Sequence, residues 1–220
     1  MSVGRTFEES LLKAIRSLET GVNHLYIHKF EAEETDSLMD YIKTGTDERI
    51  YAIAELLRRG CEVSAIATET RIDRFFLDKM QKIVDMEKEL KQCLGDKAVL
   101  YQAKKMGFSD KAIAWLWDKK ETDIFKMRKD AHIFPVYKMI DTCASEFESY
   151  VPYFYSTYEI ENESVIEDRK KIIVLGSGPI RIGQGVEFDY STVHAVKTIK
   201  EAGFEAIIIN NNPETVSTDY

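Results

Sequence analysis

The sequence has few of the residues that mark fibrous, secreted or membrane-spanning chains. Only 4 of its 220 residues are proline and 11 are glycine, too few for a collagen-like or low-complexity chain. No apolar run approaches the roughly 18 residues that a transmembrane helix needs. The N-terminus lacks the basic and then apolar order of a signal peptide. We therefore expect a cytoplasmic protein that does not associate with membranes.

Cysteine and positive charge are also scarce. The three cysteines (Cys61, Cys93 and Cys143) include no CxxC pair, which predicts free thiols in a reducing compartment and neither a disulfide framework nor a zinc site. The chain has 30 basic and 38 acidic side chains, a formal net charge of −8. Nucleic-acid-binding domains usually carry a basic excess, so this balance argues against a nucleic-acid partner.

Most of the chain has the periodicity of amphipathic helices. A capping box at Thr6 and Glu9 begins the first apolar stripe, and Asp73 begins the longest one, which ends at Gly95. Residues 22–36 are polar and irregular, which predicts a linker. Further helices are predicted from the stripe that ends at Gly60 and over 97–106, 109–118 and 122–131.

The pattern changes near the C-terminus. The aromatic stretch 150–159 is predicted to be extended, and the polar stretch 161–170 is predicted to be a hinge. Residues 172–175 are continuously apolar, as in a fully buried parallel strand. A helix over 190–202 and a second buried strand over 206–209 complete a βαβ pattern.

Two strands and one helix cannot cover both faces of a parallel sheet. We therefore expect the chain to be a truncated piece of a larger protein. The predicted fold class is mainly α, a helical domain followed by a truncated, Rossmann-like α/β segment.

A loop with four glycines (176, 178, 183 and 185) joins the first strand of this segment to its helix. Such a turn can bring backbone N–H groups against a ligand. The dinucleotide fingerprint is absent, because the third glycine follows the second by five residues and the next strand ends in Asn210–Asn212 instead of an acid. A Walker Gly-Lys-Ser/Thr sequence is also absent. By spacing alone, the loop indicates only a tight strand-to-helix turn.

The sequence of this loop, GSGPIRIGQGVEFDYSTVHA, and the later NNNPETVSTDY resemble the carbamoyl-phosphate synthetase large subunit. They match the opening of its second synthetase half. MSVGRTFEESLLKAIRSLE resembles the end of the first ATP-grasp half, and HIFPVYKMIDTCASEF with YFYSTYE resembles the oligomerisation domain. The resemblance implies three domains: the end of the first half (1–21), the helical oligomerisation domain (22–168) and the start of the second-half pre-ATP-grasp domain (169–220).

The resemblance also implies a ligase that makes carbamoyl phosphate from bicarbonate, glutamine-derived ammonia and two MgATP, for arginine or pyrimidine biosynthesis. Its implied partners are a glutaminase small subunit and other large subunits, so a homo-oligomer is expected. In the family, the ATP, magnesium and potassium ligands lie in the ATP-grasp portions. No cofactor is therefore expected in this chain, and the isolated piece is expected to be inactive.

The family places its carbamate passage beside the loops that match Gly185, Glu187 and Glu214. Gly185 could give clearance for a small anion, and the carboxylates could hold water or bind the carbamate amine. Alternatively, Gly185 only permits the turn and Glu187 only caps the helix. Arg181 could bind phosphate or form an interdomain salt bridge, and we favour the salt bridge.

Two other features permit different functions. The locally basic segment 107–131 could be a helix-turn-helix DNA reader in a stand-alone interaction module, but acidic residues interleave with its bases and a plain helical hairpin is favoured. Trp115 and Trp117 cannot share one helix face, so one could be an exposed interface anchor. His24 and His28 have the spacing of a zinc pair, but they lie in a polar region without a helical stripe, which argues against a metal site there.

Overall fold

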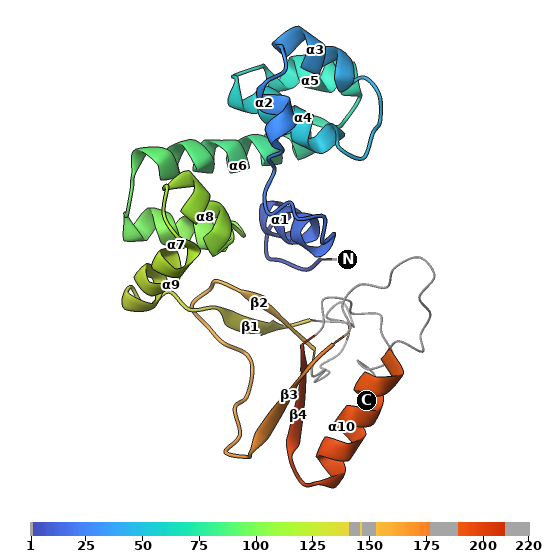
Figure 1. Cartoon of the computed structure of the whole chain (residues 1–220), viewed down its shortest axis with the longest axis vertical. Coiled ribbons are helices and arrows are strands. Elements are labelled where there is room, and N and C mark those ends of the chain that lie inside the picture. Colours follow the sequence, from blue (N-terminus) through green and yellow to red (C-terminus); the bar gives the residue numbers. More distant parts are fainter. Residues whose placement is uncertain (1, 141–145, 147–152, 177–188, 210–220) are drawn as a thin grey trace. The chain divides into compact units, whose positions relative to one another are not determined.

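The computed structural model describes residues 2–140, 146, 153–176 and 189–209. The chain divides into two compact units, Val3–Glu163 and Ser164–Tyr220, the second of which includes the first two residues. Helices α1–α9 and strands β1 and β2 belong to the first unit, and β3, α10 and β4 belong to the second (Figure 1). A mainly helical domain followed by a short α/β segment confirms the predicted fold class.

The helices of the first unit begin and end where local signals place them. Asp73 caps the longest helix by accepting a hydrogen bond from Phe75 N, and Thr6 accepts one from Glu9 N. Gly60 and Gly107 follow helices with positive φ angles, a conformation that glycine adopts without strain. The helices are α1 (Phe7–Ser17), α2 (His28–Glu31), α3 (Thr35–Tyr41), α4 (Arg49–Arg58), α5 (Val63–Thr70), α6 (Arg74–Gln92), α7 (Lys97–Lys105), α8 (Asp110–Leu116) and α9 (Glu121–Asp130).

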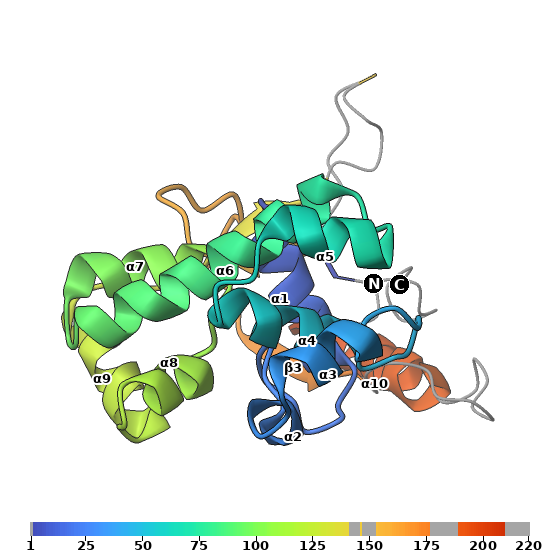
Figure 2. The ribbon, with the colours of Figure 1, turned by 90° about the horizontal axis from the view of Figure 1, so that it is seen from above.

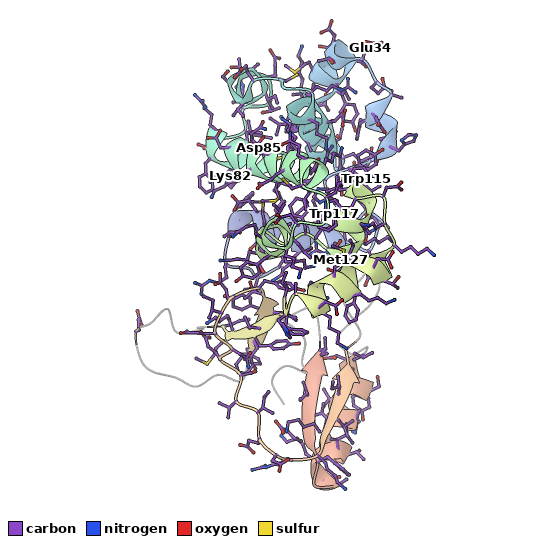
Figure 3. The ribbon with its side chains drawn as sticks, turned by 90° about the vertical axis from the view of Figure 1, so that its left-hand side faces the viewer. Glu34, Lys82, Asp85, Trp115, Trp117 and Met127 are labelled. Atoms are coloured by element: carbon purple, nitrogen blue, oxygen red, sulfur yellow. The ribbon has the colours of Figure 1, made fainter. Side chains whose placement is uncertain are left out.

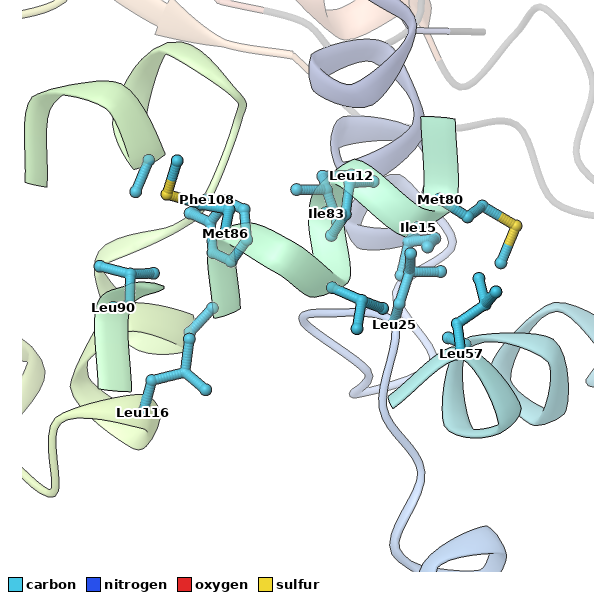
Figure 4. Packing of buried hydrophobic residues seen from close by; sticks show 14 of the residues in the cluster. Leu12, Ile15, Leu25, Leu57, Met80, Ile83, Met86, Leu90, Phe108 and Leu116 are labelled. Atoms are coloured by element: carbon cyan, nitrogen blue, oxygen red, sulfur yellow. The ribbon is translucent and has the colours of Figure 1, made fainter. Parts of the chain in front are cut away.

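Helix α6 is the axis of the first unit. It packs against α4 and α5 at one end, α7 and α8 at the other, and α1 along its side (Figure 2). Figure 4 shows Ile83 of α6 beside Leu12 of α1, with Leu25 and Leu57 close by. These four side chains have no exposed surface, and full burial of each contributes about 1.5–3 kcal/mol. One continuous apolar core therefore joins elements from residue 12 to residue 133.

The segment predicted to be a linker, residues 22–36, is part of this core, so that prediction was wrong. Leu25 and Phe30 are buried, and the segment contains α2 and the start of α3. Its few apolar side chains are too widely spaced to form a stripe, and it is held by contacts from other helices. The predicted domain boundary between residues 21 and 22 lies inside this unit.

A small antiparallel sheet ends the first unit. Strand β1 (Val136–Met139) pairs with β2 (Phe154–Thr157), which confirms extended structure within the aromatic stretch. Glu163 N donates to Tyr137 O over 2.9 Å, and Asn162 Oδ1 accepts from Tyr137 N over 2.8 Å. The first residues of the predicted hinge are thus bound to β1, and the division between the units comes after them.

The second unit has the predicted βαβ arrangement. Strand β3 (Lys171–Leu175) pairs in parallel with β4 (Glu205–Ile209), and α10 (Tyr190–Glu201) packs against both strands. The strands were predicted to be fully buried, but Ile173 is 58% exposed and Leu175 is 76% exposed. Only α10 covers this sheet among the residues that the structure describes, so its apolar side chains are left open.

Candidate functional site

The residues predicted to line a carbamate passage lie outside the described part of the chain. Gly185, Glu187 and Arg181 fall within 177–188, and Glu214 falls within 210–220. Both segments follow strand ends, because Leu175 pairs with Ile209 as the last residues of β3 and β4. Strands β3 and β4 therefore end at the same edge of the sheet, its carboxyl edge, where open α/β sheets bind their ligands.

A buried ion-pair network joins three elements of the first unit. Glu87 of α6 is 2% exposed, and its Oε2 accepts from Arg58 Nε of α4 over 2.7 Å. Glu87 Oε1 accepts from Arg58 Nη2 over 2.9 Å and lies 2.7 Å from His24 Nε2. Arg58 Nη2 also donates to Leu25 O. The network therefore fixes the chain between α1 and α2 against α4 and α6.

The ionisation of Glu87 is set by competing effects. Burial alone would raise its pKa, but hydrogen bonds from Arg58 and His24 outweigh burial and lower the pKa from 4.5 to about 2. The pKa of Arg58 is raised, because the charge and hydrogen bonds of Glu87 outweigh its own burial. The carboxylate and the guanidinium therefore stay charged in the core at neutral pH.

Sequence analysis missed this network, although one signal was available. Glu87 lies between Ile83 and Leu90 on the apolar stripe of α6, at a position where a charge needs a buried partner. The partners themselves could not be identified, because Arg58 and His24 are distant in sequence. The two histidines whose spacing was weighed as a zinc pair have different surroundings: His24 bonds Glu87, whereas His28 is exposed beside Glu31. The described residues contain no group of ligands that could hold a metal ion.

Arg59, next to Arg58, binds the other side of the same segment. Its Nη1 donates to Glu33 O over 2.7 Å, and its Nη2 donates to Phe30 O over 3.0 Å. Its Nε donates to Glu55 Oε1 over 3.0 Å, which holds the guanidinium in place. Arg58 and Arg59, at the end of α4, thus hold residues 22–36 in place, although the sequence of that segment has no helical stripe of its own.

A second buried cluster ties the α8–α9 hairpin to α7. Asp110 Oδ1 accepts from Lys104 Nζ over 2.8 Å, and Asp110 Oδ2 accepts from Arg128 Nη2 over 2.9 Å. Arg128 Nη1 also donates to Ile133 O over 3.0 Å. Burial lowers the pKa of Lys104. Because Arg128 is buried and already bonded, it cannot contact a DNA phosphate from this conformation, which weakens the helix-turn-helix alternative.

The two tryptophans face different surroundings, as predicted (Figure 3). Trp117 is 4% exposed and its Nε1 donates to Leu90 O over 2.8 Å. Trp115 is 46% exposed, and its ring lies 4.5 Å from the ring of Tyr26, measured between centroids. Lys91 Nζ lies 5.7 Å from the Trp115 ring. This exposed cluster is a candidate anchor for a protein partner.

One open cavity in the first unit measures about 530 Å³. It is lined by Lys97, Tyr101, His132, Phe134 and Glu159, among other residues. Another open cavity, of about 390 Å³, has Lys29 beside Glu33 and Asp40. Neither cavity gathers the several cations that a triphosphate with its metal needs. Within the described ranges, no helix has the length and apolar composition to cross a lipid bilayer.

Two family models match the chain. The model for the carbamoyl-phosphate synthetase large chain, oligomerisation domain, matches residues 1–132. The model for the carbamoyl phosphate synthase preATP-grasp domain matches residues 168–220. The first match covers most of the helical unit, and the second covers nearly all of the βαβ unit.

Proposed function

The chain belongs to the carbamoyl-phosphate synthetase large chain family, and on that premise we propose that it associates large chains and links two parts of that subunit without catalysing a reaction itself. The observation that carries the proposal is the match of residues 1–132 to the oligomerisation domain. The half-exposed aromatic cluster at Trp115 supports it, since such residues anchor protein interfaces.

Self-association is the first property to test. Symmetric dimers are the commonest homo-oligomers, so the 220-residue chain is expected to form dimers at micromolar concentration. Sedimentation equilibrium over a range of loading concentrations measures this directly. A single monomeric species at several hundred micromolar would contradict the proposal.

The parent enzyme would be a cytoplasmic ligase that makes carbamoyl phosphate from bicarbonate, ammonia and two ATP, for arginine or pyrimidine synthesis. A glutaminase small subunit would supply the ammonia, and magnesium and potassium would act in the ATP-grasp portions. The two family matches support this assignment at the level of the large chain. This chain would lie between the two catalytic halves.

The isolated chain is expected to lack ATPase and synthetase activity. Phosphoryl transfer needs positioned magnesium and several cations around the phosphates. In the part of the chain that the structure describes, Arg58 is already bonded to Glu87, and Lys104 and Arg128 are already bonded to Asp110. We expect MgATP to bind with a Kd of about 1 mM or weaker, which corresponds to about 4 kcal/mol. Calorimetry that gives micromolar binding would contradict this expectation.

Gly185, Glu187 and Glu214 would line the carbamate passage, and Arg181 would form an interdomain salt bridge. Their place in the two segments that follow β3 and β4 at one sheet edge supports this. In the assembled enzyme, Gly185→Leu should abolish carbamoyl-phosphate synthesis while bicarbonate-dependent ATP hydrolysis persists, because only the passage is blocked. Gly185→Ala, with its smaller side chain, should reduce synthesis less. Full synthesis by the Leu variant would disprove a passage at this residue.

A further inference from the structure

Trp115 is exposed, Tyr26 is half-buried beside it, and the pair is held in place. Tyr26 Oη donates to Glu31 Oε2 over 2.6 Å. The Arg58 guanidinium lies 5.7 Å from the Tyr26 ring, and Arg58 is itself bonded to buried Glu87. Arg58 therefore connects the aromatic pair to the buried core. An aromatic surface that is ordered before binding loses little conformational entropy when a partner covers it.

The same surface carries exposed charges of both signs. Lys91 lies over the Trp115 ring, and the side chain of Glu31 is 58% exposed beside Tyr26. Lys91 is close enough to Glu31 to help lower the pKa of that carboxyl, after the hydrogen bonds from Tyr26 and His28. Glu31 is therefore ionised at neutral pH. A surface with an aromatic centre, a cation and an anion can match a copy of itself across a two-fold axis.

Two other exposed apolar surfaces lack this combination. Beside Phe75 and Phe76, the cation Lys79 is paired over 3.4 Å with Glu8, whose carboxylate is buried and unavailable to a partner. The exposed side chains of β3 and β4 lie outside residues 1–132, the range matched by the oligomerisation domain. The residues around the aromatic pair, Tyr26, Glu31, Lys91 and Trp115, all lie inside that range.

We propose that the Tyr26–Trp115 surface, formed by Tyr26, Glu31, Lys91 and Trp115, is where two copies of this chain meet across a two-fold axis. The Trp115 rings lie at the centre, and Lys91 of each copy faces the partner's Glu31. This inference rests on the proposed self-association and names the surface that mediates it. The area around the rings excludes water, which strengthens the two charge pairs.

A charge-exchange experiment tests this arrangement. Lys91→Glu alone puts two acids opposite each other, and Glu31→Lys alone puts two lysines opposite each other, so each variant should dimerise at least about tenfold more weakly than the unmodified chain. Mixed together, the two variants should form a heterodimer with both pairs restored. The double variant should dimerise about as well as the unmodified chain. Sedimentation equilibrium measures all four samples.

Aromatic variants and a folding control complete the test. Trp115→Ala should weaken dimerisation at least about tenfold, whereas Phe125→Ala on α9, which is similarly exposed, should leave it unchanged. Circular dichroism checks that each monomer is folded. Glu31→Gln, which keeps the side-chain shape, replaces Glu31→Lys if the latter unfolds, and should weaken dimerisation as well.

The results separate the two proposals. If the unmodified chain dimerises but the single variants and Trp115→Ala dimerise equally well, this surface is wrong and self-association stands. The same holds if the mixed variants do not associate. If the unmodified chain remains monomeric, both proposals fail.

Discussion

The carboxylate of Glu87 on α6 bonds both Arg58 of α4 and His24, which lies between α1 and α2. It is ionised in the core because Arg58 and His24 both reach it. Removing one member of a buried ion pair usually costs about 3–5 kcal/mol, since the other charge stays buried without a partner. The stability of the first unit should therefore depend on this residue and on its protonation.

The pH dependence of unfolding tests this at Glu87. Its pKa is lowered from 4.5 to about 2 on folding, so its contribution is complete above pH 4.5 and is lost as the pH falls towards 2. The shift corresponds to about 3 kcal/mol. Glu87→Gln should lower the free energy of unfolding by about 3 kcal/mol at pH 7, measured by urea denaturation. Between pH 4.5 and 2 its stability should fall less steeply than that of the unmodified chain.

Glu89→Gln provides the matched control on the same helix. Glu89 is exposed, so its replacement should change the free energy of unfolding by less than about 0.5 kcal/mol. If the stability curves of the Glu87 variant and the unmodified chain run parallel from pH 5 to pH 2, Glu87 is not the group that is held ionised.

At the scale of elements, the turn between α7 and α8 is packed directly on α1. Gly107 there has a φ of +94°, and a Cβ on it would lie 2.8 Å from Glu9 Cα. Gly60, after α4, has a φ of +84° and no atom within 4 Å of such a Cβ. The two glycines thus share a backbone conformation but differ in whether a neighbouring backbone is close.

Replacement by alanine at these two positions should separate the two effects. Gly60→Ala should cost about 1–2 kcal/mol, the penalty for a left-handed conformation. Gly107→Ala should cost at least twice as much, because α1 must also move. If thermal or urea unfolding shows that both variants lose the same free energy of unfolding, the close approach of Gly107 to Glu9 does not contribute to stability.

The elements that the sequence predicted correctly are those whose signals are local. Asp73 and Gly95 bound the longest predicted helix, and α6 lies between them. Residues 22–36 were predicted wrongly because Arg58 and Arg59, more than twenty residues away, order them. Strand β3 was predicted correctly in type, but apolar composition does not show how far other elements cover its side chains.

At the scale of the whole molecule, the connection between the two units begins at a defined residue. Glu163 Oε2 accepts from Met139 N over 2.7 Å, and Glu163 Oε1 accepts from Lys138 Nζ over 2.9 Å. The hydrogen bond from Lys138 lowers the pKa of Glu163, with a further contribution from Met139 N. Beyond Ser164, where the second unit begins, Val165 and Ile166 are exposed.

Limited proteolysis with a glutamate-specific protease tests this boundary. Cleavage after Glu167 should be faster than after Glu163, because the backbone at Glu163 is bonded to β1. Asn162→Ala removes the acceptor of the hydrogen bond from Tyr137 N, so it should loosen this attachment and increase cleavage after Glu163. Mass spectrometry of the early fragments shows which of the two sites is cleaved first. Equal initial rates at both sites in the unmodified chain would contradict it.

The candidate functional residues could be predicted from the sequence less well than the fold. The passage residues were inferred from a family resemblance, and they lie outside the described residues. The exposure of one tryptophan followed from helix geometry, but its ring contact with Tyr26 did not. Residues 26 and 115 are joined by tertiary packing alone, for which the sequence has no local signal.

The bonds from Arg58 and Arg59 also constrain the order in which the first unit folds. Helices α2 and α3 have four and seven residues, too short to persist alone in water. The carbonyls of Leu25, Phe30 and Glu33 accept hydrogen bonds from the side chains of Arg58 and Arg59, at the C-terminal end of α4. We therefore expect this segment to become ordered after α4 has formed. Contacts made late in folding are absent from the transition state, so loosening them speeds unfolding more than it slows folding. We therefore expect this segment to affect how long the native unit persists more than how fast it forms.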